Sequence, residues 1–144
     1  MIVVVDASAA VKLVLDEPGS AVVRRLWAEP VRWVAPSVVV PEVAAAVSAA
    51  RRAGRLRATA ERRVQATWVQ VSEEIDLLAV DAALAGAAGR LAAGRPVRGM
   101  DAVYLAAAGM LVARDTVCLL SFDGRQRGAV RSEDDIVLLP TDVG

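Results

Sequence analysis

The sequence predicts an α/β fold in which helices cover both faces of a parallel sheet. Short, continuous apolar runs alternate along the chain with longer segments whose apolar residues recur at helical spacing. The first run, Ile2–Val5, is β-branched and has no polar alternation, which is typical of a strand buried on both faces. Strands that alternate with helices favour right-handed β-α-β connections. The 144 residues contain no linker or repeat, so we expect a single domain over residues 1–144.

Five apolar runs are predicted to be the strands of this sheet. Each is short, rich in β-branched or leucine side chains, and bounded by polar residues, glycine or proline. Pro36 is expected to end the second run, because proline cannot donate to a strand ladder. The predicted strands cover residues 2–5, 31–35, 75–80, 116–121 and 136–139.

The segments between these runs are predicted to be helices. Ser20 and Thr59 are expected to be N-caps, and Pro41 fits the first turn of a helix, where a missing N–H costs little. Gly54 is expected to end the helix that follows Pro41, and Gly94 to end the alanine-rich one. The predicted helices cover residues 7–15, 20–27, 42–52, 59–71, 82–93 and 101–113.

The composition excludes several kinds of chemistry. The 17 basic and 17 acidic residues cancel, so any site for a polyanion has to come from a local arrangement of charge. The chain has no histidine, which removes the commonest general base and the usual zinc ligand. Catalysis would therefore have to use carboxylates, hydroxyls or arginines.

Cysteine usage and hydropathy indicate the compartment. The single cysteine, Cys118, lies in an apolar run and cannot form an internal disulfide, which fits a reducing environment. Asp6 interrupts the first apolar run before it can serve as a signal peptide, and charged residues interrupt every stretch that approaches the roughly 20 apolar residues of a membrane helix. We therefore expect a cytoplasmic protein that does not enter a membrane.

Two carboxylates follow predicted strands. Asp6 comes directly after the first run, and Asp123 comes shortly after the fourth. Ligands of open parallel sheets bind beyond the carboxyl ends of the strands, so both side chains are expected in that crevice. The alternative interpretation is that each merely caps the next helix.

Two further acids lie in line with apolar helical stripes. Asp101 shares a helix face with Leu105 and Ala108, and Glu42 shares a helix face with Ala46. A carboxylate on an inward face must be paired, protonated or bound to metal, because an isolated buried charge is too costly. The alternatives are an N-cap role for Asp101 and a surface position for Glu42.

Four carboxylates gathered together would repel one another and raise each other's pKa values unless a cation were present. Mg²⁺ and Mn²⁺ prefer oxygen ligands and are commonly held by a few carboxylates together with substrate phosphates. Such ions activate water and stabilise phosphoryl charge, which permits phosphodiester hydrolysis without histidine. We therefore predict that Asp6, Glu42, Asp101 and Asp123 bind Mg²⁺ or Mn²⁺.

Along nearly its full length, the chain resembles the PIN-domain nucleases, and among them the VapC toxins of toxin–antitoxin pairs. The four acids occur in the family's order and with similar flanks. The matching stretches are residues 4–9 (VVDASA), 16–19 (DEPG), 34–37 (VAPS), 41–43 (PEV), 99–106 (GMDAVYLA) and 120–123 (LSFD). Two positions depart from the family pattern: Gly124 stands where a basic residue is common, and Ala46 where many relatives are polar.

The resemblance implies a three-layer α/β/α sandwich and a Mg²⁺- or Mn²⁺-dependent endoribonuclease that forms a homodimer and is neutralised by a cognate antitoxin. It also implies that the four acids carry catalysis and metal binding, and that Ser8 and Ser121 hydrogen-bond the carboxylates without binding the metal. The alternatives are a catalytically silent PIN-like module that binds RNA or an antitoxin, and a phosphatase or DNA nuclease on a related scaffold.

Arginines near the acids are candidates for holding RNA phosphates. Arg125 and Arg127 follow Asp123, and a larger group surrounds the turn at Gly54. The alternative is that these arginines are solvated charges on an otherwise apolar protein.

Overall fold

The computed structural model describes residues 1–141. Its sheet has five strands in the order β3-β2-β1-β4-β5, and every neighbouring pair is parallel. The strands are β1 (Ile2–Val5), β2 (Arg32–Pro36), β3 (Asp76–Leu78), β4 (Val117–Leu120) and β5 (Ile136–Leu139). The helices are α1 (Ala7–Val14), α2 (Ser20–Trp27), α3 (Val39–Arg52), α4 (Ala58–Glu73), α5 (Ala82–Gly94), α6 (Gly99–Leu111) and α7 (Gly124–Ala129), and a 3₁₀ turn, η1, covers Ser132–Asp134.

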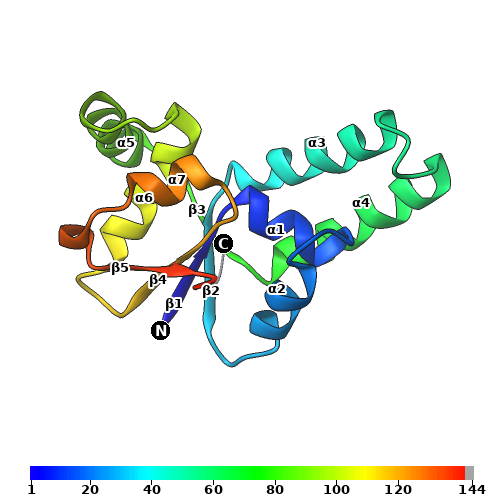
Figure 1. The fold of residues 1–144 in the computed structure, drawn as a ribbon, viewed down its shortest axis with the longest axis horizontal. Helices are drawn as coiled ribbons and strands as arrows, with labels where there is room; N and C mark the ends of the chain where they lie inside the picture. The colour runs from blue at the N-terminus through cyan, green and yellow to red at the C-terminus, as the bar shows by residue number, and fades with distance from the viewer. Residues whose placement is uncertain (142–144) are drawn as a thin grey trace.

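Helices cover both faces of the sheet (Figure 1). α1 to α4 lie on one side, α6 and α7 lie on the other, and α5 packs against α6. The central strand β1 serves both layers, because successive side chains of a strand point to opposite faces. Val3 and Val5 join the core with α1 to α4, whereas Ile2 and Val4 join the core with α6 and α7. The predicted α/β/α sandwich is confirmed.

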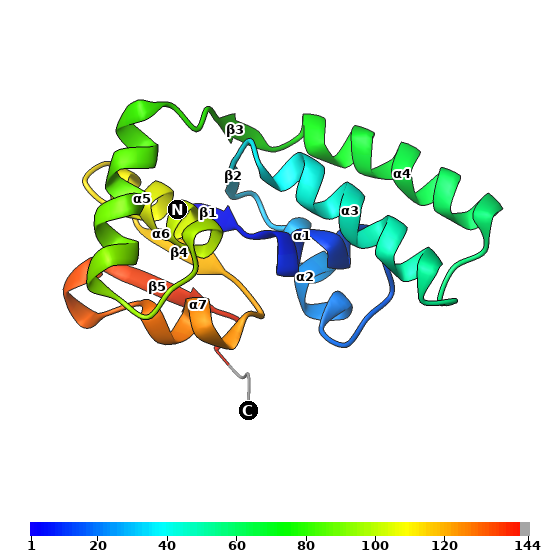
Figure 2. The ribbon, with the colours of Figure 1, turned by 90° about the horizontal axis from the view of Figure 1, so that it is seen from above.

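α3 and α4 form an antiparallel hairpin that projects away from the sheet (Figure 2). Trp68 Nε1 donates to the carbonyl oxygen of Val40 at 3.0 Å, and Gln65 Nε2 donates to that of Ala44 at 2.9 Å. Gly54 follows α3 with φ of +76°, a left-handed conformation that glycine adopts without steric cost. The hairpin thereby fixes the start of α3, which carries Glu42.

All eleven predicted strands and helices are present, and the main differences concern how helices begin. Gly19, with φ of +90°, is the N-cap of α2, while Ser20 Oγ instead donates to the carbonyl oxygen of Leu15 at 2.9 Å. Thr59 does not cap α4, because that helix begins at Ala58. The prediction of N-caps at Ser20 and Thr59 was therefore wrong, since tertiary contacts and an earlier helix start override the capping preference.

The sequence indicated that a helix begins after Asp123, which α7 confirms, but it did not predict the extent of that helix or η1. The six residues of α7 have no apolar periodicity, so their pattern does not show where the helix ends. None of the helices within residues 1–141 is long and apolar enough to cross a membrane.

Candidate functional site

The sheet has its topological switch point between β1 and β4. The chain passes from β1 through β2 to β3 and then returns to place β4 on the other side of β1. Ligands of open α/β sheets bind beyond the strand ends at such a point. Asp6 follows β1 directly, and its backbone N donates to the carbonyl oxygen of Leu120, the last residue of β4, at 3.1 Å. Asp6 and the segment that carries Asp123 therefore share this edge.

Asp6 is a buried carboxylate with several hydrogen-bond donors. Oδ2 accepts from Ser121 Oγ at 2.5 Å, and Oδ1 accepts from Ser8 Oγ at 2.7 Å and from the backbone N of Ala9 at 2.9 Å. Burial raises the pKa of the carboxyl from 3.8 to about 6, although these hydrogen bonds lower it, and the charge of Asp123 adds to the rise. The carboxyl of Asp6 therefore keeps its proton to a higher pH than an aspartate in water does.

Asp123 is the N-cap of α7. Its Oδ1 accepts from the backbone N of Arg125 at 2.8 Å and from that of Gln126 at 3.1 Å. Its own backbone N donates to Ser121 Oγ at 3.1 Å, so Ser121 contacts both acids. Asp6 caps α1 in the same manner. The capping interpretation therefore holds for both acids, and it is compatible with a binding role because both caps lie at the switch point.

Asp101 lies in the first turn of α6, whose N-cap is Arg98, so Asp101 is not an N-cap. Its Oδ2 is buried and has no hydrogen-bond partner among the described residues. Burial and then the charge of Asp123 raise the pKa of Asp101, whereas the positive charges of Arg98 and Arg125 oppose this rise. Asp101 thus interacts electrostatically with Asp123, the N-cap of α7.

Glu42 is paired with a tyrosine. It is half-buried in the first turn of α3, and its Oε2 accepts a short hydrogen bond from the hydroxyl of Tyr104 on α6. Burial, followed by the hydrogen bond and charge of Glu42, raises the pKa of Tyr104 far above 10.0, and the charge of Asp6 contributes. Tyr104 therefore stays a neutral donor that orients Glu42.

The donor set fits a hard divalent cation in its chemistry. All candidate ligands are carboxylate oxygens, and the Oδ2 of Asp101 has no hydrogen-bond partner among the described residues that would compete with coordination of a cation. Asp123 repels charge on both Asp6 and Asp101. Within residues 1–141, however, no three acidic, cysteine or histidine residues lie close enough together to hold an ion as a group. Mg²⁺ is often held by one or two carboxylates with water and substrate phosphate, so such a group is not required.

Comparison with known proteins identifies the family. The model of the PIN domain matches residues 3–131. The chain belongs to the PIN-domain family. Ribonuclease VapC45 of Mycobacterium tuberculosis (strain CDC 1551 / Oshkosh) is 37% identical to it over 107 residues, which are 72% of each protein. This similarity makes the chain a VapC-type PIN protein.

Solved structures share the PIN fold of this chain. VapBC2 from Rickettsia felis, bound to a DNA fragment from its promoter, superposes with a TM-score of 0.65 at 13% identity and covers 96% of this chain and 97% of its own. Mycobacterium tuberculosis VapC20, described as a Sarcin-Ricin loop cleaving toxin, gives a TM-score of 0.64 at 22% identity, covering 88% and 94%.

The arginines of this PIN domain have different environments. Arg125 is exposed, and its positive charge opposes the rise in the pKa of Asp101. Arg127 instead donates to the carbonyl oxygens of Ser121, Leu139 and Pro140 at 3.1, 2.8 and 2.9 Å. The prediction that Arg127 holds substrate phosphate is therefore corrected, because its guanidinium is engaged in tying α7 to the ends of β4 and β5.

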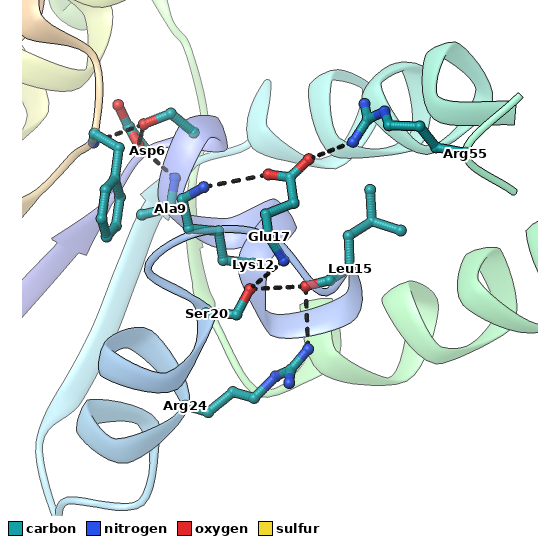
Figure 3. Close-up of polar contacts among 10 residues, drawn as sticks. Asp6, Ala9, Lys12, Leu15, Glu17, Ser20, Arg24 and Arg55 are labelled. Atoms are coloured by element: carbon teal, nitrogen blue, oxygen red, sulfur yellow. Dashed lines mark hydrogen bonds and ion pairs between the residues drawn. The ribbon is translucent and has the colours of Figure 1, made fainter. Parts of the chain in front are cut away.

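A partly buried ion-pair network lies beside the site on the side of α1 (Figure 3). Glu17 accepts from Lys12 Nζ at 3.2 Å and from Arg55 at 2.9 Å. Burial raises the pKa of Glu17, but the two hydrogen bonds outweigh it and hold that pKa below its ordinary value. Lys12 Nζ also lies 4.8 Å from the centre of the Phe122 ring, next to Asp123 in the chain. The network thus holds the loop after α1 close to the site.

Three residues of the site were not found from the sequence: Arg98, Tyr104 and Gln126. Tyr104 lies within the stretch 99–106 that resembles the family, so the sequence pointed to this part of the chain. The sequence did not show that Tyr104 pairs with Glu42. Nothing in the pattern of residues 124–129 indicates that Gln126 is buried.

Proposed function

We propose that this chain is a Mg²⁺- or Mn²⁺-dependent endoribonuclease that acts as the toxin of a toxin–antitoxin pair. The observation that supports this best is the meeting of Asp6 and Asp123 at the switch point of the sheet, with Asp101 within electrostatic reach of Asp123. A divalent cation relieves the repulsion between neighbouring carboxylates, and a phosphodiester can complete the coordination of that cation.

In this proposal Asp6, Glu42, Asp101 and Asp123 bind the cation, one or two of them directly and the others through its water ligands. When bound, the cation supplies an activated water and neutralises charge on the phosphoryl oxygens. The residues around the acids fix their direction: Ser121 and Ser8 hold Asp6.

Further side chains would act on Glu42 and on the RNA. Tyr104 directs Glu42 by donating to Oε2, and its raised pKa keeps the hydroxyl proton in place. Arg125, exposed beside Asp101, is proposed to contact a phosphate of the RNA.

The relatives support the substrate and the partner. VapC45 is named a ribonuclease, VapC20 is described as a toxin that cleaves the Sarcin-Ricin loop, and the VapBC2 structure is an assembly on promoter DNA. By similarity we propose RNA as the substrate, a cognate antitoxin as the partner, a homodimer without membrane attachment, and a cytoplasmic location. We also propose that residues 1–144 form one nuclease domain.

The test is cleavage by the Asp101→Asn variant in Mg²⁺ and in Mn²⁺. Asparagine keeps the size of the side chain but removes the charge, and we expect cleavage of RNA to fall by at least about 100-fold. Asp81→Asn is the matched control, because Asp81 is an exposed N-cap of α5 that lies outside the site. Unchanged cleavage by Asp101→Asn would refute the proposed site. Parallel assays on single-stranded DNA and on a phosphomonoester distinguish the DNA nuclease and phosphatase alternatives.

One observation favours the silent-module alternative: no group of three acids within residues 1–141 is close enough to hold an ion. Protein free of antitoxin that binds RNA but never cuts it, with either metal, would establish this alternative.

A further inference from the structure

Gln126 is a fully buried polar residue between two acids of the site. It lies on α7, and its Nε2 donates to the backbone carbonyl oxygen of Asp101 on α6 at 3.2 Å. Its backbone N donates to Asp123 Oδ1 at 3.1 Å. One residue therefore contacts Asp101 and Asp123, which belong to different elements.

The hydrogen bonding of this junction is incomplete. Gln126 Oε1 is buried and has no partner among the described residues, and the same is true of Asp101 Oδ2. An unpaired buried oxygen lowers stability, whereas an apolar side chain of similar volume would fill the same space without that cost. The packing of α6 on α7 therefore does not explain why an amide occupies this position.

We infer that Gln126 is a positioning residue that fixes Asp101 relative to Asp123 for cation binding. The amide anchors the first turn of α6, and the backbone N of the same residue holds Asp123. The spacing between the two carboxylates is thus set by one side chain and its own backbone. This inference rests on the proposed function, because it assigns Gln126 a role toward the cation of that site.

The inference is tested by Mn²⁺ binding to Gln126→Met, measured by titration calorimetry in the absence of RNA. Methionine keeps the length of the side chain and removes the amide. We expect Mn²⁺ affinity to fall about 10-fold, as for other residues that orient metal ligands. We also expect the metal-free variant to be at least as stable as the wild type, because the unpaired Oε1 is gone. Gln126→Leu serves as a second variant if methionine does not support folding.

Ala129→Gly is the control for a change in α7 itself. Ala129 is buried on the same helix. Among the described residues, the side chain that donates a hydrogen bond to it is that of Arg95, which contacts its backbone carbonyl oxygen. We expect this variant to be less stable but to bind Mn²⁺ with wild-type affinity, the reverse of Gln126→Met. A folded Gln126→Met or Gln126→Leu variant with wild-type Mn²⁺ affinity would overturn the inference while leaving the proposed function intact. If the Asp101→Asn variant binds Mn²⁺ as tightly as the wild type does, the proposed function is overturned, and this inference with it.

Discussion

Replacing Asp6 by asparagine is expected to remove a pH-dependent loss of stability from the metal-free protein. Burial raises the pKa of this carboxyl from 3.8 to about 6 in the folded chain. Below pH 3.8 both folded and unfolded chains carry a protonated Asp6, so there is no penalty. Between the two values the unfolded chain releases a proton that the folded chain keeps, and the free energy of unfolding falls as pH rises. Since one pKa unit corresponds to about 1.36 kcal/mol, the loss reaches about 3 kcal/mol above pH 6.

The assay is equilibrium denaturation of wild type and Asp6→Asn in a metal chelator across this pH range. The informative quantity is the difference between their free energies of unfolding, because other carboxyls, such as Asp134 with its lowered pKa, titrate in both proteins. We expect this difference to shift by about 3 kcal/mol in favour of the variant between pH 3.8 and about 6, and then to level off.

Asp81→Asn controls for the exchange itself, because Asp81 also caps a helix, accepting from Leu84 N at 2.9 Å, but is exposed. A difference curve for Asp6→Asn that stays flat, or that matches the control, would refute the reasoning. Saturating Mn²⁺ is expected to suppress the pH-dependent difference in free energy of unfolding between the variant and the wild type, because a cation bound at Asp6 favours the ionised carboxylate.

Three further substitutions test individual contacts. Tyr104→Phe removes the hydroxyl that donates to Glu42, and we expect RNA cleavage to fall about 10-fold with an unchanged circular dichroism spectrum; a wild-type rate would contradict the positioning role. Arg127→Met removes donors to three backbone carbonyls, and urea denaturation is expected to show a loss of about 2 kcal/mol with RNA affinity retained; lost affinity at unchanged stability would restore the phosphate role. Gly19→Ala introduces a Cβ at φ of +90° and 2.5 Å from Phe122 Cε1, so we expect a loss of about 1 kcal/mol or more, and an equal melting temperature would argue against this strain.

The sequence determined the elements of the fold and the acids that follow strands. Continuous apolar runs mark strands buried on both faces, and helical spacing marks the segments between them, because these patterns depend on neighbouring residues alone. Asp6 could therefore be placed at the carboxyl end of β1 before the structure was known. The start of α7 after Asp123 was indicated by the same pattern, whereas the length of this short helix was not, because its residues have no apolar periodicity.

Only the tertiary structure decided which of the distant groups meet. Tyr104 contacts Glu42 across 62 positions of the chain, and Ser121 contacts Asp6 across 115. Such pairs follow from strand order and register, which place β4 beside β1 and α6 near the start of α3. The same long-range packing buries Gln126 between two acids and brings Arg127 within hydrogen-bond distance of backbone carbonyl oxygens. Local periodicity does not encode these contacts, because each depends on the position of an element folded from a distant part of the chain.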